Sequence, residues 1–116
     1  MVETQVTKTV RINSTGQVVP NDRVMPVRLA EDVKWVATAG GGPWKITFDK
    51  SPSGGEGTYP ILSGSPFSET EYTIAAGASG GSTGGPVNGT MRRTYRYNVR
   101  RATTNEITDD PDIDIE

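Results

Sequence analysis

Three arginines at intervals of four residues, Arg92, Arg96 and Arg100, are the side chains whose type and spacing could most directly bind a ligand. Apolar and aromatic residues alternate with polar ones along this stretch, which is typical of a strand with an inner and an outer face. On a strand, the three guanidinium groups would follow one another at about 13 Å along one face. Such a row could bind an anion, a nucleic acid or an acidic partner.

The acidic residues near the end of the sequence offer the arginines a different role. Asp112, Asp114 and Glu116 alternate with Ile113 and Ile115, which predicts another strand with an acidic outer face. If this strand pairs with the arginine strand, the two outer faces coincide. Opposite charges would then form a cross-strand ladder, in which each pair contributes at most about 1 kcal/mol. We favour the ladder over a binding face, and the sequence leaves both open.

The same acidic run also resembles a set of calcium ligands. Its carboxylates alternate at Asp110, Asp112, Asp114 and Glu116. A calcium-binding EF-hand loop needs a glycine at its sixth position and a curled backbone, whereas this run is predicted to be extended. Carboxylates along a strand diverge, so we expect no metal site.

Composition excludes the commonest catalytic groups. The chain has no histidine and no cysteine, so it has no imidazole base, no thiolate nucleophile and no disulfide. Carboxylates occur in pairs at 31–32, 69/71 and 109–110, all in predicted turns or edges where nothing would bury one member of the pair. Acid–base catalysis requires carboxyl groups in unequal environments. We therefore expect neither an enzyme nor a cofactor-binding protein.

Length and charge indicate one domain without a strong electrostatic field. The chain has 116 residues, a net charge of −2, 14 glycines and 8 prolines, which favours short strands, long loops and a thin core. A charge this small would not drive binding to nucleic acid or to an anionic membrane. Residues 1–5 are unlike a secretory leader. We expect a cytoplasmic location, or a secreted or periplasmic one if a leader has been removed.

Alternation with period two recurs along the chain and predicts the fold. The pattern favours an all-β, antiparallel Greek-key sandwich of immunoglobulin-like type with about 7–8 strands in a single domain. Pro26 belongs at a sheet edge because it cannot donate to a strand ladder. The aromatic residues of inward parity are expected in the core; they are Trp35, Trp44, Tyr95 and Tyr97. The predicted strands cover 2–12, 24–29, 33–36, 44–48, 71–75, 91–101 and 112–116.

Three glycine-rich loops lie between these strands, at 39–43, 51–58 and 76–89. The last of them closes at Asn88-Gly89, a dipeptide suited to a hairpin turn. None has the lysine and the strand–helix context of a phosphate-binding loop. Loops on a rigid sandwich are a common place for protein recognition, so we expect any protein partner to bind there.

Four short segments together resemble the cupredoxin family. Members carry a Val-x-Trp strand, a His-x-Val-x-Phe strand, a Tyr-x-Tyr-x-Cys strand and a closing strand. The corresponding segments here are Val33-Lys34-Trp35, Trp44-Lys45-Ile46-Thr47-Phe48, Tyr95-Arg96-Tyr97-Asn98-Val99 and Ile113-Asp114-Ile115. The resemblance covers residues 24–116 and implies a cupredoxin-like sandwich.

The resemblance fails at the copper ligands. Trp44 stands where the first histidine ligand would be, and Val99 stands in place of the cysteine. The loop 102–108 contains neither histidine nor methionine. Because a blue-copper site needs two imidazoles and a thiolate, the chain is not an electron-transfer copper protein. It looks similar to small uncharacterised bacterial proteins of copper-free cupredoxin-like type, many of which end in a similar Asp-Pro-Asp-Ile strand.

The sequence thus favours a non-catalytic interaction module that presents its loops to a protein partner. A structural or assembly subunit, in a homo-oligomer or a particle, is the alternative. In that case, edge strands that contain proline would meet neighbouring copies.

Overall fold

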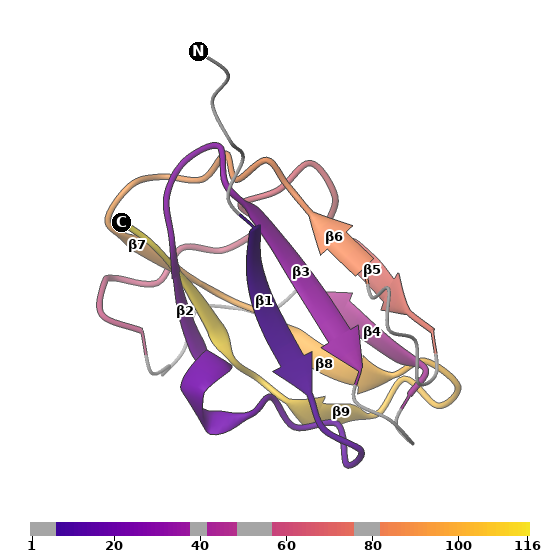
Figure 1. Cartoon of the computed structure of the whole chain (residues 1–116). Helices are drawn as coiled ribbons and strands as arrows, with labels where there is room; N and C mark the ends of the chain where they lie inside the picture. Colours follow the sequence, from indigo (N-terminus) through magenta and orange to yellow (C-terminus); the bar gives the residue numbers. More distant parts are fainter. Residues whose placement is uncertain (1–6, 38–41, 49–56, 76–81) are drawn as a thin grey trace.

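The chain folds into an all-β, sandwich-like structure, as predicted (Figure 1). The computed structural model describes residues 7–37, 42–48, 57–75 and 82–116. Within these ranges no helix is long and apolar enough to cross a membrane. Among the described residues, the only helical element is a 3-10 turn, η1 (Pro20–Asp22). The strands are β1 (Thr7–Ile12), β2 (Val24–Val27), β3 (Asp32–Ala37), β4 (Trp44–Thr47), β5 (Glu71–Ile74), β6 (Ser82–Gly84), β7 (Arg93–Arg96), β8 (Asn98–Arg101), β9 (Ile107–Asp109) and β10 (Asp112–Ile115).

These strands form three sheets. Sheet A has the order β1-β3-β6, sheet B the order β2-β10-β7, and sheet C the order β5-β4-β8-β9. Sheet A lies in front of the strands of sheets B and C in Figure 1. β1 and β2 are edge strands of their sheets, which confirms the predicted edge position of Pro26 in β2. β1 is parallel to β3 and β2 is parallel to β10, whereas the sequence predicted antiparallel pairing throughout.

Sheets B and C share two segments of chain. β7 continues into β8 after one residue, Tyr97, and β9 continues into β10 after Asp110 and Pro111. The Tyr97 N–H donates to the Pro111 carbonyl at 3.1 Å, so the two segments stay paired where they change sheet. Residues 97–99 are all buried, because the chain is covered on both sides at this crossing.

The predicted single strand 91–101 is therefore wrong in its extent. It is two strands, of which β8 is central in sheet C and β7 is the last strand of sheet B. Met91, the first residue of the predicted strand, lies in a turn and is 55% exposed. Arg92, the other residue of this turn, has φ 58°, so the backbone turns sharply just before β7 begins.

The core consists of inward residues from all three sheets. Trp35, Trp44, Tyr95 and Tyr97 are all buried, which confirms their predicted place. The Trp35 ring stacks on Tyr72 with 5.3 Å between centroids and contacts Tyr97 edge to face at 5.8 Å. Aromatic pairs in these geometries stabilise a core beyond the area that they bury.

Two predicted loops contain strands. Loop 102–108 includes the start of β9, and loop 76–89 includes β6. Asn88-Gly89 is not a hairpin turn, because β6 belongs to sheet A and β7 to sheet B. The chain instead crosses between sheets there, held by the Asn88 N–H, which donates to the Pro66 carbonyl at 2.7 Å. Residues 39–41, 51–56 and 76–81 of the predicted loops lie outside the described residues.

Candidate functional site

The predicted arginine row is divided between two sheets. Arg96 lies in β7, and its Nη2 is 2.5 Å from Asp110 Oδ2. Arg100 lies in β8, where its guanidinium donates to Thr47 Oγ1 at 3.1 Å and to the Asn105 carbonyl at 3.0 Å. Both arginines thus have partners within the fold.

Arg92 is different from the other two arginines. It is exposed in the turn before β7, and its backbone N–H donates to the Ile115 carbonyl at 2.8 Å. Among the described residues, its guanidinium makes no ion pair. Of the three arginines in the predicted row, Arg92 is thus the one that remains accessible to a ligand.

The predicted charge ladder is only partly formed. β10 does pair with β7, in antiparallel register, and Asp112 lies opposite Arg96 as the ladder requires. Asp114 lies opposite Thr94 rather than an arginine. Asp112 and Asp114 are 1% and 3% exposed, so they are buried groups and not members of a surface ladder.

Residues 57–59 cover these two carboxylates. The Gly57 N–H donates to Asp112 Oδ2 and the Thr58 N–H donates to Asp114 Oδ2, both at 3.0 Å. The Thr94 hydroxyl donates to Asp114 Oδ1 at 2.6 Å. Sequence reasoning missed this arrangement, which we call the carboxylate clamp (Gly57, Thr58, Thr94, Asp112 and Asp114). It fixes the described part of the predicted loop 51–58 against sheet B.

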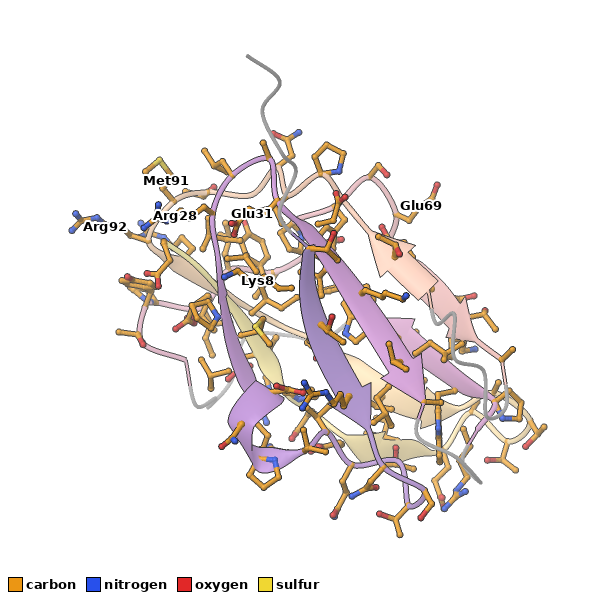
Figure 2. All side chains as sticks on the ribbon, viewed as in Figure 1. Lys8, Arg28, Glu31, Glu69, Met91 and Arg92 are labelled. Atoms are coloured by element: carbon orange, nitrogen blue, oxygen red, sulfur yellow. The ribbon has the colours of Figure 1, made fainter. Side chains whose placement is uncertain are left out.

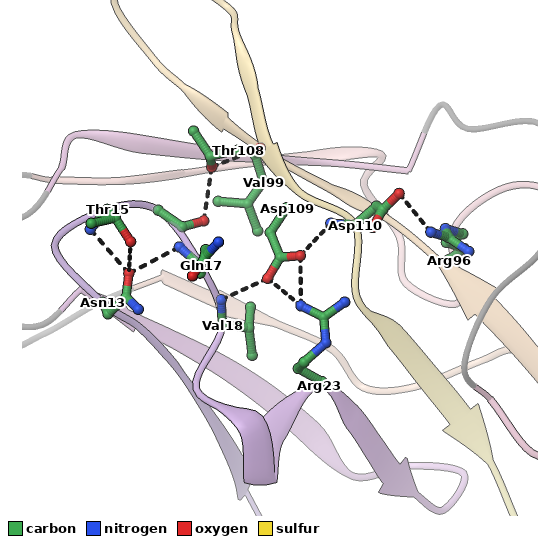
Figure 3. A network of polar contacts seen from close by, with 11 residues as sticks. Asn13, Thr15, Gln17, Val18, Arg23, Arg96, Val99, Thr108, Asp109 and Asp110 are labelled. Carbon is green, nitrogen blue, oxygen red and sulfur yellow. Dashed lines mark hydrogen bonds and ion pairs between the residues drawn. The ribbon is translucent and has the colours of Figure 1, made fainter.

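A second polar network joins the segment 16–23 to the segment 99–109 (Figure 3). Asp109 accepts from the Val18 N–H at 2.8 Å and is ion-paired with Arg23. The Thr108 hydroxyl donates to the carbonyls of Gly16 and Val99, at 2.8 and 3.1 Å. These groups are satisfied by protein partners, so the network stabilises the fold.

In the described part of the chain, no three acidic side chains are placed to hold a metal ion. Burial raises the pKa of Tyr97, while the neighbouring Trp35 indole acts in the opposite direction. The hydroxyl of Tyr59 donates to Glu116 Oε2 at 2.8 Å. This bond is the main cause that raises the pKa of Tyr59, and the charge of Arg92 lowers it.

A polar pocket of about 340 Å³ lies where edge strands β1 and β2 come together; we call it the basic pocket. Lys8 points into it because it shares parity with the core residues Val10 and Ile12 on β1. Figure 2 shows Lys8 and Glu31 close to one another in this region. The pocket is lined by Lys8, Pro26, Arg28, Glu31 and Glu116.

An adjoining apolar pocket of about 420 Å³ lies on the other side of the turn 28–31. Its most prominent side chain is Leu29, which is 43% exposed. Two backbone hydrogen bonds hold the turn rigidly. The Ala30 N–H donates to the Val87 carbonyl at 3.0 Å, and the Val87 N–H donates to the Glu31 carbonyl at 2.7 Å. The lining residues are Leu29, Ala30, Ser68, Pro86, Val87 and Asn88.

The two pockets thus lie on either side of the turn 28–31. Comparison of the chain with protein-family models, with curated proteins and with solved structures finds no match.

Proposed function

We propose that the chain is a non-catalytic β-sandwich module that binds another protein through the end of the sandwich that carries the turn 28–31. The observation that supports this most is the apolar pocket with Leu29 at its rim, held on a rigid turn beside exposed cations. Apolar surface with a polar margin is characteristic of protein interaction sites. Of the three predicted loops, 76–89 contributes to this surface through residues 86–88.

We further propose that the scaffold is a copper-free cupredoxin-like sandwich. The four segments that resemble the family fall on β3, β4, β7 with β8, and β10. Trp44, at the position of the first histidine ligand, is buried, and the Arg101 guanidinium lies 5.4 Å from the centroid of its ring. A chain without histidine or cysteine lacks the donors of a blue-copper site, so this end of the sandwich has a packing role.

The interaction proposal is tested by affinity capture from the source cells with the immobilised chain. We expect saturable retention of one partner, and we expect Leu29→Asp to abolish it. The matched control is Leu62→Asp, because Leu62 is similarly exposed but does not line the pocket. Equal capture by the wild type and both variants, or no saturable capture at all, would contradict the proposal.

The alternative function, a subunit of a homo-oligomer or particle, is favoured by one observation. Ile107 is 48% exposed on β9, the last strand of sheet C, and exposed apolar edge strands are prone to pair with other copies. Light scattering of the purified chain separates the two functions. A stable monomer over a wide concentration range supports the interaction module, and a defined oligomer that Ile107→Lys dissociates supports the assembly subunit.

A further inference from the structure

We propose that the basic pocket and the apolar pocket form one composite site, which binds an extended peptide that carries carboxylates next to an aliphatic side chain. This inference rests on the proposed function, because it specifies the partner surface that the same end of the sandwich would recognise. Arg28 and Leu29 are consecutive residues, yet one lines the basic pocket and the other lines the apolar pocket. A ligand that lies across the turn 28–31 therefore meets both.

The carboxylates of the basic pocket already have donors. Glu31 Oε1 accepts the Arg28 backbone N–H at 2.7 Å, and Glu116 Oε2 accepts the Tyr59 hydroxyl at 2.8 Å. These bonds orient both carboxylates toward protein groups. Both donors are neutral, so each carboxylate keeps its negative charge.

The cations around the pocket are in the opposite situation. In the ranges that the structure describes, no carboxylate lies within ion-pair distance of Lys8, Arg28 or Arg92. Arg28 and Arg92 are exposed and Lys8 lines the pocket, so each can approach a ligand. The side chains that line the pocket, together with Arg92 beside Glu116, carry three positive charges against two negative ones, and this net charge of +1 favours an anionic ligand.

Strand register places two of these cations on either side of Glu116. Val27, Ile115 and Arg93 lie side by side across sheet B. Arg28, Glu116 and Arg92 are the next residues in the same direction along β2, β10 and β7, and Figure 2 shows Arg28 and Arg92 at the same end of the molecule. Two guanidinium groups at one strand end can each bind a carboxylate in a bidentate manner.

The shape of the site favours a peptide over a compact small molecule. A rigid turn separates the two pockets, so a compact ligand fills one of them and leaves the other. In an extended peptide, alternate side chains lie on one face at about 7 Å spacing. Such a peptide can place an aliphatic group beside Leu29 and a carboxylate beside Arg28 at the same time.

The acidic run of a second copy does not meet this requirement. Asp112 and Asp114 are buried in the carboxylate clamp, and their oxygens accept hydrogen bonds from residues 57, 58 and 94. They become available only if the end of the sandwich unfolds. The ligand that we propose is a segment of a different protein.

The test is fluorescence anisotropy with a short labelled peptide that repeats leucine, serine, glutamate and serine. This repeat puts leucine and glutamate on one face of an extended chain. We expect saturable binding to the wild-type chain, and little binding of the two matched peptides that replace glutamate by lysine or leucine by serine. Equal affinity for the leucine-free peptide would show that the surface attracts any anion, which would overturn the composite site.

Variants of the chain locate the contact. We expect Lys8→Gln, Arg28→Gln and Leu29→Ser each to weaken binding about tenfold, because a charge-assisted hydrogen bond or a buried aliphatic side chain contributes on this order. The control is Lys34→Gln, which removes a positive charge on β3 at the parity opposite to the core. Unchanged affinity in all three site variants would overturn the proposal.

The outcome for the composite site is separable from that for the interaction module. If affinity capture shows a partner whose retention depends on Leu29 but no acidic peptide binds, the module is supported and the composite site is wrong. If neither experiment shows binding, both proposals fail. Thermal melting of each variant confirms that the fold is retained before binding is measured.

Discussion

Two regions of this molecule have acidic and basic residues on the same sheet, yet they differ in how those charges are used. In the carboxylate clamp, Asp112 and Asp114 are buried and accept N–H and O–H donors from the chain itself. At the end of the same strands, Arg28 of the basic pocket and Arg92 of the turn before β7 make no ion pair with described residues. A charge whose partners are inside the fold stabilises that fold, whereas an accessible charge without partners can bind a ligand.

The largest effect on stability is expected from a variant that removes one carboxylate of the clamp. Asp114→Ala leaves the Thr58 N–H and the Thr94 hydroxyl without their buried acceptor, so we expect the free energy of unfolding to fall by about 3 kcal/mol. Urea denaturation measures this change. Asp114→Asn, which keeps one acceptor oxygen, should lose less. A loss below about 1 kcal/mol for the alanine variant would mean that the clamp contributes little to stability.

A smaller loss of stability is expected when Gly57 is substituted. A Cβ at this position would lie 2.2 Å from Thr94 Cγ2 and 2.6 Å from Asp114 Oδ1, so Gly57→Ala forces residue 57 away from the clamp. We expect a cost of about 2 kcal/mol, as for other overpacked sites. The comparison variant is Gly64→Ala, which meets no atom within 4 Å but has φ +97°, and whose backbone strain costs about 1 kcal/mol. Urea denaturation of both variants should rank them in this order.

Two tyrosines extend the comparison to the pH dependence of stability. Burial raises the pKa of Tyr97, so the unfolded chain loses this proton more readily than the folded chain. The stability contributed by Tyr97 is therefore fully present below about pH 10 and falls above it, by up to about 1.4 kcal/mol for each pH unit. In Tyr97→Phe, the stability measured by alkaline denaturation should depend less steeply on pH. Tyr59→Phe, at the exposed end, should leave the curve close to that of the wild type.

The smallest effect on stability is expected at the basic pocket. Arg28→Gln removes an exposed charge without an ion pair among the described residues, so the free energy of unfolding should change by less than about 0.5 kcal/mol. Loss of peptide binding with unchanged stability would sharpen the distinction between the two regions. A substantial destabilisation, measured by urea denaturation, would place Arg28 with the structural charges instead.

Local pattern was sufficient to predict most strands of this protein and its aromatic core. Alternation of apolar and polar residues located β3, β4, β5 and β10, and parity placed Trp35, Trp44 and Tyr97 inside. These features depend on side-chain direction along a strand, which is a property of neighbouring residues. The expectation for Pro26 succeeded for the same reason, since the missing N–H belongs to the residue itself.

The charged residues could not be assigned in this way. Alternation put Asp112 and Asp114 on an outer face, but only the return of residues 57–59 over that face made them buried. The row of arginines was divided because the chain changes sheet at Tyr97, where both of its sides become covered. Contacts between segments distant in sequence decide such outcomes, and periodicity contains no information about them.

The sequence by itself determined an all-β chain without imidazole or thiolate chemistry, because composition and alternation are local properties. Only the tertiary structure decided which charged side chains have partners within the fold. It buried the carboxylates of β10 under backbone donors and left Lys8 and Arg28 at the basic pocket and Arg92 exposed in a turn. The physical reason is that a charge is stabilised by whatever surrounds it, and those surroundings come from strands and loops that meet only when the chain has folded.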